Sequence, residues 1–231
     1  MTIGKSGFEL VVFDWDGTLM DSQARIVACI QAAFADADLE PPSHQAASDI
    51  IGLGLDEALG RLCPACDARQ RAALVAYYRR RFLVTDETTS ELFPGAGAML
   101  ERLLGQGYLL AVATGKSRAG LAKELEITGL GRLFHATRCA DETFSKPHPQ
   151  MLLELMDELG VHSTQTLMVG DTEYDLQMAA NARAFSLAVC YGVHPPERLL
   201  ACGPLACLES VADIPGWLAG RARRGSSGRG V

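Results

Sequence analysis

The feature that most constrains the fold is a repeated alternation between short apolar segments and amphipathic segments. The apolar segments are bounded by turn residues and are typical of buried strands. They cover residues 8–14, 109–114, 166–171 and 184–192, with a weaker candidate at 136–140. Patterns typical of helices lie between them, at residues 95–106, 117–128, 148–160 and 173–182. The alternation predicts an α/β protein in which helices cover both faces of a parallel sheet, with the carboxyl ends of the strands at one edge.

One region interrupts this alternation directly after the first strand. Residues 22–88 show no strand pattern and contain only helical patterns, near 22–38, 55–63 and 67–84. A connection of about 65 residues is too long for an ordinary crossover between strands. We therefore expect two units: a core formed by residues 1–20 and 89–231, and an inserted helical unit formed by residues 21–88.

Charge and hydropathy narrow the range of partners. The 231-residue chain carries a formal net charge of −7, which disfavours non-specific binding to nucleic acid. It has no apolar run long enough to span a membrane, and its first residues lack the apolar segment of a signal peptide. These observations predict a cytoplasmic protein, a monomer or homodimer, without nucleic-acid or membrane partners.

Two further segments carry expectations of their own. The seven cysteines are an odd number, and in a cytoplasmic protein we expect them to be reduced thiols, including the Cys63 and Cys66 pair. The basic, Gly- and Ser-rich residues 221–231 are expected to be disordered. An RNA contact through the arginines of this tail is the less favoured alternative.

Polar side chains cluster at the ends of the expected strands. The first strand runs directly into Asp14 and Asp16, although carboxylates are rarely buried unless they are paired or bind a metal. The expected strands at residues 109–114 and 166–171 also end in polar residues, and a lysine lies in the loop before the strand at 166–171. These residues are Thr114 with Gly115, Asp171 with Asp175, and Lys146. Because a parallel sheet brings its carboxyl ends together, we expect all of them to converge on one site.

Such a set of side chains supports phosphoryl transfer. Clustered carboxylates favour a bound divalent cation, and oxygen ligands suit Mg²⁺. One carboxylate can attack phosphorus, while a second protonates the leaving oxygen and then activates water. A hydroxyl and a lysine can hold the phosphoryl oxygens. Taken singly, each residue has a simpler explanation: Thr114 can cap a helix, Lys146 can lie on the surface, and acids are common at helix N-termini.

The order of these motifs resembles the haloacid dehalogenase-like superfamily of phosphohydrolases. The segments DWDGT (14–18), Thr114-Gly115, Lys146 and GDTEYD (170–175) are similar to its four motifs. The run from ATGKSRAGL through MVGDTEYDLQMAANA is similar to the phosphoglycolate phosphatase-like branch. The resemblance implies an α/β fold with a Rossmann-like parallel sheet core and an inserted all-helical cap. It also implies a Mg²⁺-dependent phosphatase that hydrolyses a small, phosphoglycolate-like metabolite through an aspartyl-phosphate intermediate.

The resemblance also assigns roles to individual residues. It implies that Asp14 is the nucleophile and Asp16 the general acid and base, and that Thr114, Gly115 and Lys146 bind the phosphoryl group. Asp14, Asp171 and the backbone carbonyl of Asp16 would hold Mg²⁺. Asp175 is expected to support the metal site or to orient Lys146. Thr18 is expected to assist from the first-motif loop as a substrate-binding residue.

Alternatives remain open within the same superfamily and outside it. Dehalogenases of the family lack an acid at the position of Asp16, so its presence favours an ester substrate. Phosphomutases typically carry a His shortly after the first motif, and none is present here. A non-catalytic binding protein would not need Asp16 or Asp171. A second anionic group of a substrate could be held by arginines of the helical region, which are Arg25, Arg61 and Arg79 to Arg81.

Overall fold

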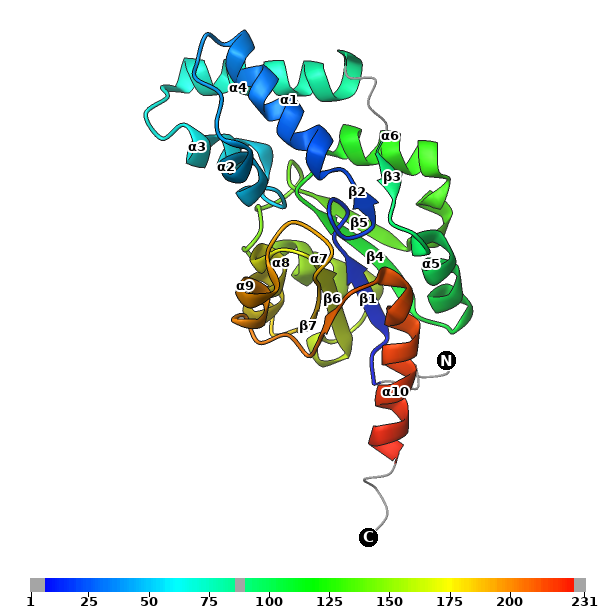
Figure 1. Ribbon diagram of the computed structural model, residues 1–231. Helices are drawn as coiled ribbons and strands as arrows, with labels where there is room; N and C mark the ends of the chain where they lie inside the picture. Colours follow the sequence, from blue (N-terminus) through cyan, green and yellow to red (C-terminus); the bar gives the residue numbers. More distant parts are fainter. Residues whose placement is uncertain (1–6, 86–89, 227–231) are drawn as a thin grey trace.

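The computed structural model describes residues 7–85 and 90–226 and contains a six-stranded parallel sheet (Figure 1). The strand order is β5-β4-β1-β6-β7-β8, so that β1 lies between β4 and β6. The strands are β1 (Leu10–Phe13), β4 (Leu109–Thr114), β5 (Ala136–Cys139), β6 (Thr166–Gly170), β7 (Phe185–Val189) and β8 (Cys207–Leu208). The predicted α/β fold is confirmed, and β8 is an addition, because a two-residue strand leaves no detectable sequence pattern.

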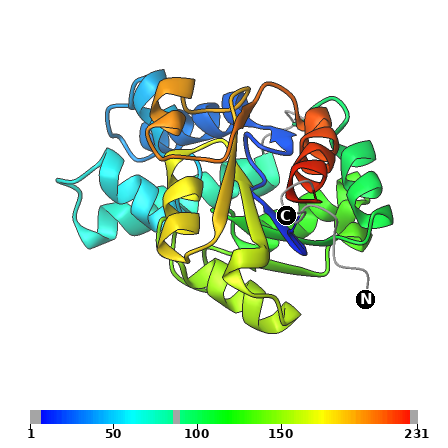
Figure 2. The ribbon, with the colours of Figure 1, turned by 90° about the horizontal axis from the view of Figure 1, so that it is seen from below.

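Helices cover both faces of the sheet, as the uninterrupted apolar strands require. Neighbouring side chains of a strand point to opposite faces: Val11 and Phe13 pack with α5, α6 and α10, whereas Leu10 and Val12 pack with α7 and α8. Figure 2 shows these helices on the two sides of the strands. Their bounds are α5 (Ala96–Gly105), α6 (Arg118–Thr128), α7 (Gln150–Leu159), α8 (Glu173–Asn181) and α10 (Ile214–Ser226), with the short α9 (Pro196–Leu200) beside β8.

A second group of helices follows β1 and lies over the carboxyl ends of the strands (Figure 1). It comprises α1 (Gln23–Asp36), α2 (His44–Asp49), α3 (Leu55–Leu62) and α4 (Ala68–Arg80), followed by a π-helical turn (Arg81–Thr85). These helices share their own apolar cluster, which includes Ile30, Phe34 and Leu74. The unpredicted α2 follows the Pro41-Pro42 break, and the side chain of Ser43 caps it by accepting from the Ala46 N–H.

A short antiparallel ladder marks the two places where the chain passes between the sheet and these helices. It pairs β2 (Met20–Asp21) with β3 (Glu91–Leu92). No helix in the described part of the chain has both the length and the apolar character that crossing a membrane requires.

The expectation of a disordered tail is wrong for residues 221–226, which continue α10. The helix is anchored by Ile214 and Leu218, whose side chains are buried against the sheet. The guanidinium of Arg221 lies over the rings of Trp217 and Phe8, at 5.2 and 5.7 Å from their centroids. Residues 227–231 lie outside the described part of the chain.

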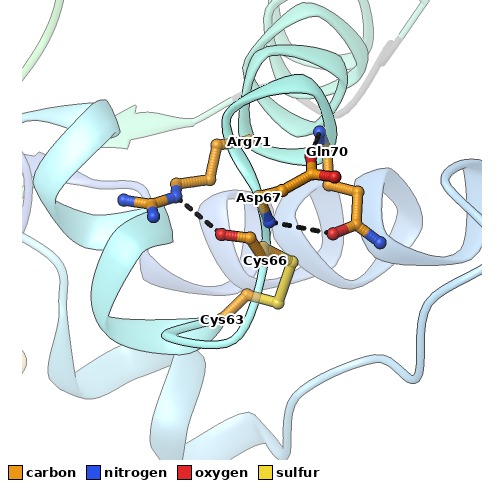
Figure 3. The surroundings of a disulfide bond; sticks show 5 residues. All are labelled: Cys63, Cys66, Asp67, Gln70 and Arg71. Carbon is orange, nitrogen blue, oxygen red and sulfur yellow. Dashed lines mark hydrogen bonds between the residues drawn. A yellow bond between two sulfur atoms is a disulfide. The ribbon is translucent and has the colours of Figure 1, made fainter.

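The expectation of reduced thiols is wrong for Cys63 and Cys66, which form a disulfide between α3 and α4 (Figure 3). A tight turn, in which the Cys66 N–H donates to the Cys63 carbonyl at 3.1 Å, brings the two residues together. The next residue, Asp67, caps α4 through a reciprocal pair of hydrogen bonds with Gln70. The other five cysteines form no disulfide, as expected.

Reduction of this disulfide is expected to destabilise the helical region slightly. A cross-link that closes a loop of about four residues contributes about 2 kcal/mol by the chain-entropy relation. Urea unfolding of the wild type should therefore show a loss of about that size on addition of dithiothreitol. The variant Cys63→Ser/Cys66→Ser should be unaffected by the reductant, and an equal loss in this variant would contradict the prediction.

Candidate active site

Three aspartates meet at the carboxyl edge of the sheet. Asp14 follows β1, Asp171 follows β6, and Asp175 lies in the first turn of α8. All three are buried, and one carboxylate oxygen from each lies within 4.8 Å of the others. The sequence predicted this convergence for Asp14, Asp171 and Asp175 from their places at strand ends.

The ammonium of Lys146 lies between two of these carboxylates. Its Nζ is 2.6 Å from Asp14 Oδ1 and 2.6 Å from Asp175 Oδ1, and its side chain has no exposed surface. Lys146 lies in the loop before α7 and is joined to Pro147 by a cis peptide bond. Burial lowers the pKa of the ammonium, but the two carboxylates raise it further, so that the net pKa is above the usual value. Lys146 is therefore a charged residue of the site.

Asp171 is held by two donors from different segments. The hydroxyl of Thr18 donates to Oδ1 at 2.8 Å, and the Val193 N–H donates to Oδ2 at 2.8 Å. Burial, followed by the charge of Asp175, raises the pKa of Asp171 to about 7. Burial also raises the pKa of Asp14, against the opposing effect of Lys146. In both residues burial disfavours the charged carboxylate, and the neighbouring acids act in the same direction.

The cluster fits a divalent cation. Three carboxylates face one ammonium, and Asp14 Oδ2 accepts no hydrogen bond from the described residues. A buried, unpaired carboxylate oxygen is costly unless a cation or a donor compensates it. The ligand atoms are all oxygens, which are the ligands that Mg²⁺ prefers.

The side chain of Asp16 lies in a second polar cluster. Its Oδ1 accepts from the hydroxyl of Ser22 and is 3.0 Å from Nζ of Lys116. The same ammonium is 3.0 Å from Glu124 Oε1, and the indole N–H of Trp15 donates to Glu124 Oε2. Sequence reasoning missed the roles of Ser22, Lys116 and Glu124. Lys116 directly follows Thr114-Gly115 at a strand end, which is a usable signal, but no local pattern connects Glu124 to Trp15.

Thr114 and Gly115 lie where β4 meets the helical region. Thr114 is fully buried, and its hydroxyl accepts from the Lys116 N–H at 3.2 Å. A Cβ on Gly115 would lie 2.5 Å from the Leu53 carbonyl, so only glycine allows the loop between α2 and α3 to approach this closely. The IIGLGL segment (50–55) therefore contacts the site edge.

Polar contacts also join α2 to the sheet side. The Tyr174 hydroxyl donates to the Asp49 carbonyl at 2.9 Å, and Arg198 pairs with the Asp49 carboxylate. Arg198 also pairs with Glu173 at 2.5 Å. These contacts hold the helical region against the edge that carries the acids.

Most of the arginines considered for a second anion are engaged elsewhere. Arg61 pairs with Glu57, Arg81 pairs with Asp36, and Arg25 donates to the Phe82 carbonyl. Arg79 lines the cavity that opens beside Asp14 and Asp16. This cavity has a volume of about 250 Å³ and lies between the sheet edge and the helical region.

Comparison with known proteins agrees with this geometry. Residues 11–189 match the model of the haloacid dehalogenase-like hydrolase family, and the chain belongs to this family. A relative named probable phosphatase IndB from Dickeya dadantii is 37% identical over 211 residues, covering 90% of this chain and 92% of the relative. A phosphoglycolate phosphatase from Cupriavidus necator is 32% identical over 218 residues, covering 90% and 92%.

Solved structures give the same result. The crystal structure of a predicted phosphoglycolate phosphatase from Haemophilus somnus superposes with a TM-score of 0.80 at 27% identity, covering 91% of this chain and 98% of that chain. A predicted phosphatase from Clostridium acetobutylicum gives a TM-score of 0.83 at 25% identity, covering 92% and 99%. The identification of a haloacid dehalogenase-like hydrolase of the phosphatase type, similar to phosphoglycolate phosphatases, is confirmed.

Substitution of Gly17 is expected to damage the acid cluster. Gly17 has φ +81°, and a Cβ would lie 2.1 Å from Asp171 Oδ2. Gly17→Ala should lower the free energy of unfolding by about 1–3 kcal/mol and abolish most activity, because Asp171 must move. Gly107→Ala is the matched control, since Gly107 has φ +87° but open space around its Cβ. Equal activity loss in both variants would show that backbone strain alone is responsible.

Removal of the Lys116 ammonium is expected to destabilise the fold. Lys116→Met leaves Asp16 and Glu124 buried without their cation, which should cost about 3–5 kcal/mol in urea unfolding. Lys123→Met, at an exposed position on α6, the helix that carries Glu124, should cost about 1 kcal/mol or less. Similar losses for the two variants would contradict the role assigned to the buried cluster.

Proposed function

We propose that this chain is a Mg²⁺-dependent phosphatase that hydrolyses a small phosphorylated metabolite through an aspartyl-phosphate on Asp14. The observation that carries the proposal is the state of the Asp14 carboxylate. One oxygen is fixed by Lys146 at 2.6 Å, while the other accepts no hydrogen bond from the described residues. A carboxylate that is oriented through one oxygen and unengaged at the other is arranged for nucleophilic attack.

Asp14 and Asp16, the two acids of the first motif, have separate roles in the proposed reaction. The Asp14 carboxylate attacks phosphorus, the bond between phosphorus and the ester oxygen breaks, and Asp16 gives its proton to the leaving oxygen. Asp16 then takes a proton from water, the water oxygen attacks the same phosphorus, and the carboxylate of Asp14 leaves. Asp16 lies two residues beyond Asp14 and is held by Ser22 and Lys116, which supports this separate acid and base role.

The remaining side chains hold the phosphoryl group and the acids. Lys146 neutralises charge that develops on the phosphoryl oxygens, assisted by Thr114 and the backbone at Gly115. Thr18, which was expected to assist from the first-motif loop, donates to Asp171 and so fixes the orientation of that carboxylate.

Asp14, Asp171 and the backbone carbonyl of Asp16 would hold Mg²⁺. Asp175 has a supporting role, because its Oδ1 pairs with Lys146 and its Oδ2 accepts from the backbone and hydroxyl of Thr172. When bound, the cation neutralises carboxylate charge and polarises the phosphoryl oxygens.

Residues 21–88 act as a cap in this proposal, and residues 1–20 and 89–231 as the core. The cap carries its own apolar cluster and contacts the site edge through Leu53 and Asp49. A unit of this kind can exclude water while the ester bond is broken, which strengthens the electrostatic effects of Lys146 and Asp16. The proposal places the enzyme in the cytoplasm.

Phosphate release from a panel of esters tests the function. The panel should include a generic aryl phosphate and 2-phosphoglycolate, the compound named by the relatives. Release should require Mg²⁺, stop with EDTA and return on addition of Mg²⁺. Asp14→Asn should lower kcat about 10³-fold or more and Asp16→Asn about 10²–10⁴-fold.

Asp157→Asn, an exposed acid on α7, is the control and should leave kcat unchanged. Sugar-phosphate interconversion with little phosphate release would indicate a phosphomutase instead. A folded protein that acts on no ester would indicate a non-catalytic binding protein.

A further inference from the structure

The cavity beside Asp14 and Asp16 shows which leaving group the site can accept. Any phosphate ester whose phosphorus faces Asp14 must extend its alcohol part into this cavity, which is the space between the acids and the helical region. Its volume of about 250 Å³ lies just below the roughly 300–1,000 Å³ that is typical of small-molecule sites. The walls of the cavity therefore determine which alcohols bind.

The walls contributed by the helical region are mainly apolar. Ile26 and Ile30 line the cavity from α1, Ile51 and Leu53 from the loop between α2 and α3, and Phe82 from the π-helical turn. All five are buried. Apolar walls bind an apolar or aromatic body by removing its surface from water, and they offer nothing to a charged group.

The charges around the cavity also oppose a second anion. Five of the described lining residues are acids, Asp14, Asp16, Asp56, Glu57 and Asp141, whereas two are cations, Lys116 and Arg79. Glu57 is paired with Arg61 at 2.7 Å, and Asp56 and Asp141 are exposed to solvent.

Neither cation is a good partner for a carboxylate of the substrate. The ammonium of Lys116 is already shared between Asp16 and Glu124, at 3.0 Å from each. Its remaining face lies over the ring of Phe82, 4.4 Å from the centroid. Arg79 is exposed to solvent, where an ion pair contributes little.

We propose that this site selects phosphate monoesters of neutral alcohols with an apolar or aromatic body and discriminates against esters that carry a second anionic group, 2-phosphoglycolate included. The inference rests on the proposed phosphatase function and names the substrate class of the same site. The specificity is set by the five apolar wall residues, because Lys116, the buried cation among the described lining residues, is already paired with Asp16 and Glu124.

Two ester pairs of matched chemistry test the inference. In 4-carboxybenzyl phosphate a carboxylate replaces one ring hydrogen of benzyl phosphate, and in 2-phosphoglycolate a carboxylate replaces the methyl group of ethyl phosphate. For each pair the neutral ester should have a kcat/KM about tenfold higher or more, with benzyl phosphate above ethyl phosphate.

Variants at the cavity wall connect the preference to these residues. Leu55 lines the cavity and is half-buried, so Leu55→Lys places a cation there and should reduce the preference within each pair by about tenfold. Ile127→Lys, which adds the same charge on an exposed part of α6, should leave the preference unchanged. Arg79→Gln should change the turnover of 2-phosphoglycolate less than about twofold.

The outcomes separate the inference from the function on which it rests. Release of phosphate from no ester would refute the proposed phosphatase. If the esters are hydrolysed but the carboxylate-bearing member of each pair has an equal or higher kcat/KM, the inference is overturned and the phosphatase function stands. Selective loss of 2-phosphoglycolate turnover in Arg79→Gln would also overturn it, because Arg79 would then be the binding group for a second anion.

Discussion

The ion pairs of Lys146 with Asp14 and Asp175 are the interaction on which the site depends. Three buried carboxylates repel one another, and Lys146 is the cation that the described chain places among them. Buried ion pairs are weak sources of stability, because desolvation offsets their attraction. The sheet and its helices must therefore hold the cluster in place through the apolar cores on both faces. The fold therefore holds the cluster together, and the cluster adds little to the stability of the fold.

Parallel topology explains why the cluster has a single location. β1 lies between β4 and β6, so the residues that follow these three strands share one edge. Two clusters of acids, each with its own lysine, lie at that edge. Lys146 organises the acids around Asp14, while Lys116 organises Asp16 with Glu124. Two lysines thus separate the carboxylate that attacks from the carboxylate that moves protons in the proposed mechanism.

Sequence patterns predicted best the elements that are so deeply buried that their residues must be apolar. Strands buried on both faces must be continuously apolar, which identifies β1, β4, β6 and β7. Elements held by a few contacts have no such signal: β8 has two residues, and α2 has six. The helix at residues 221–226 was missed because its composition is basic and Gly-rich, although the buried anchor at Leu218 lies just before it. The disulfide has no sequence signal of its own, because the tight turn that brings Cys63 and Cys66 together is a property of the folded chain.

The sequence by itself determined the identity and order of the acids, the lysine and the strands that carry them. Each of these is a local property, either a residue type or a short apolar run. Only the tertiary structure decided which groups meet: Trp15 with Glu124, Gly115 with Leu53, and the apolar walls with Asp14 and Asp16. These contacts join segments that are distant along the chain. They depend on how the helices pack on the sheet, and no local pattern records that packing.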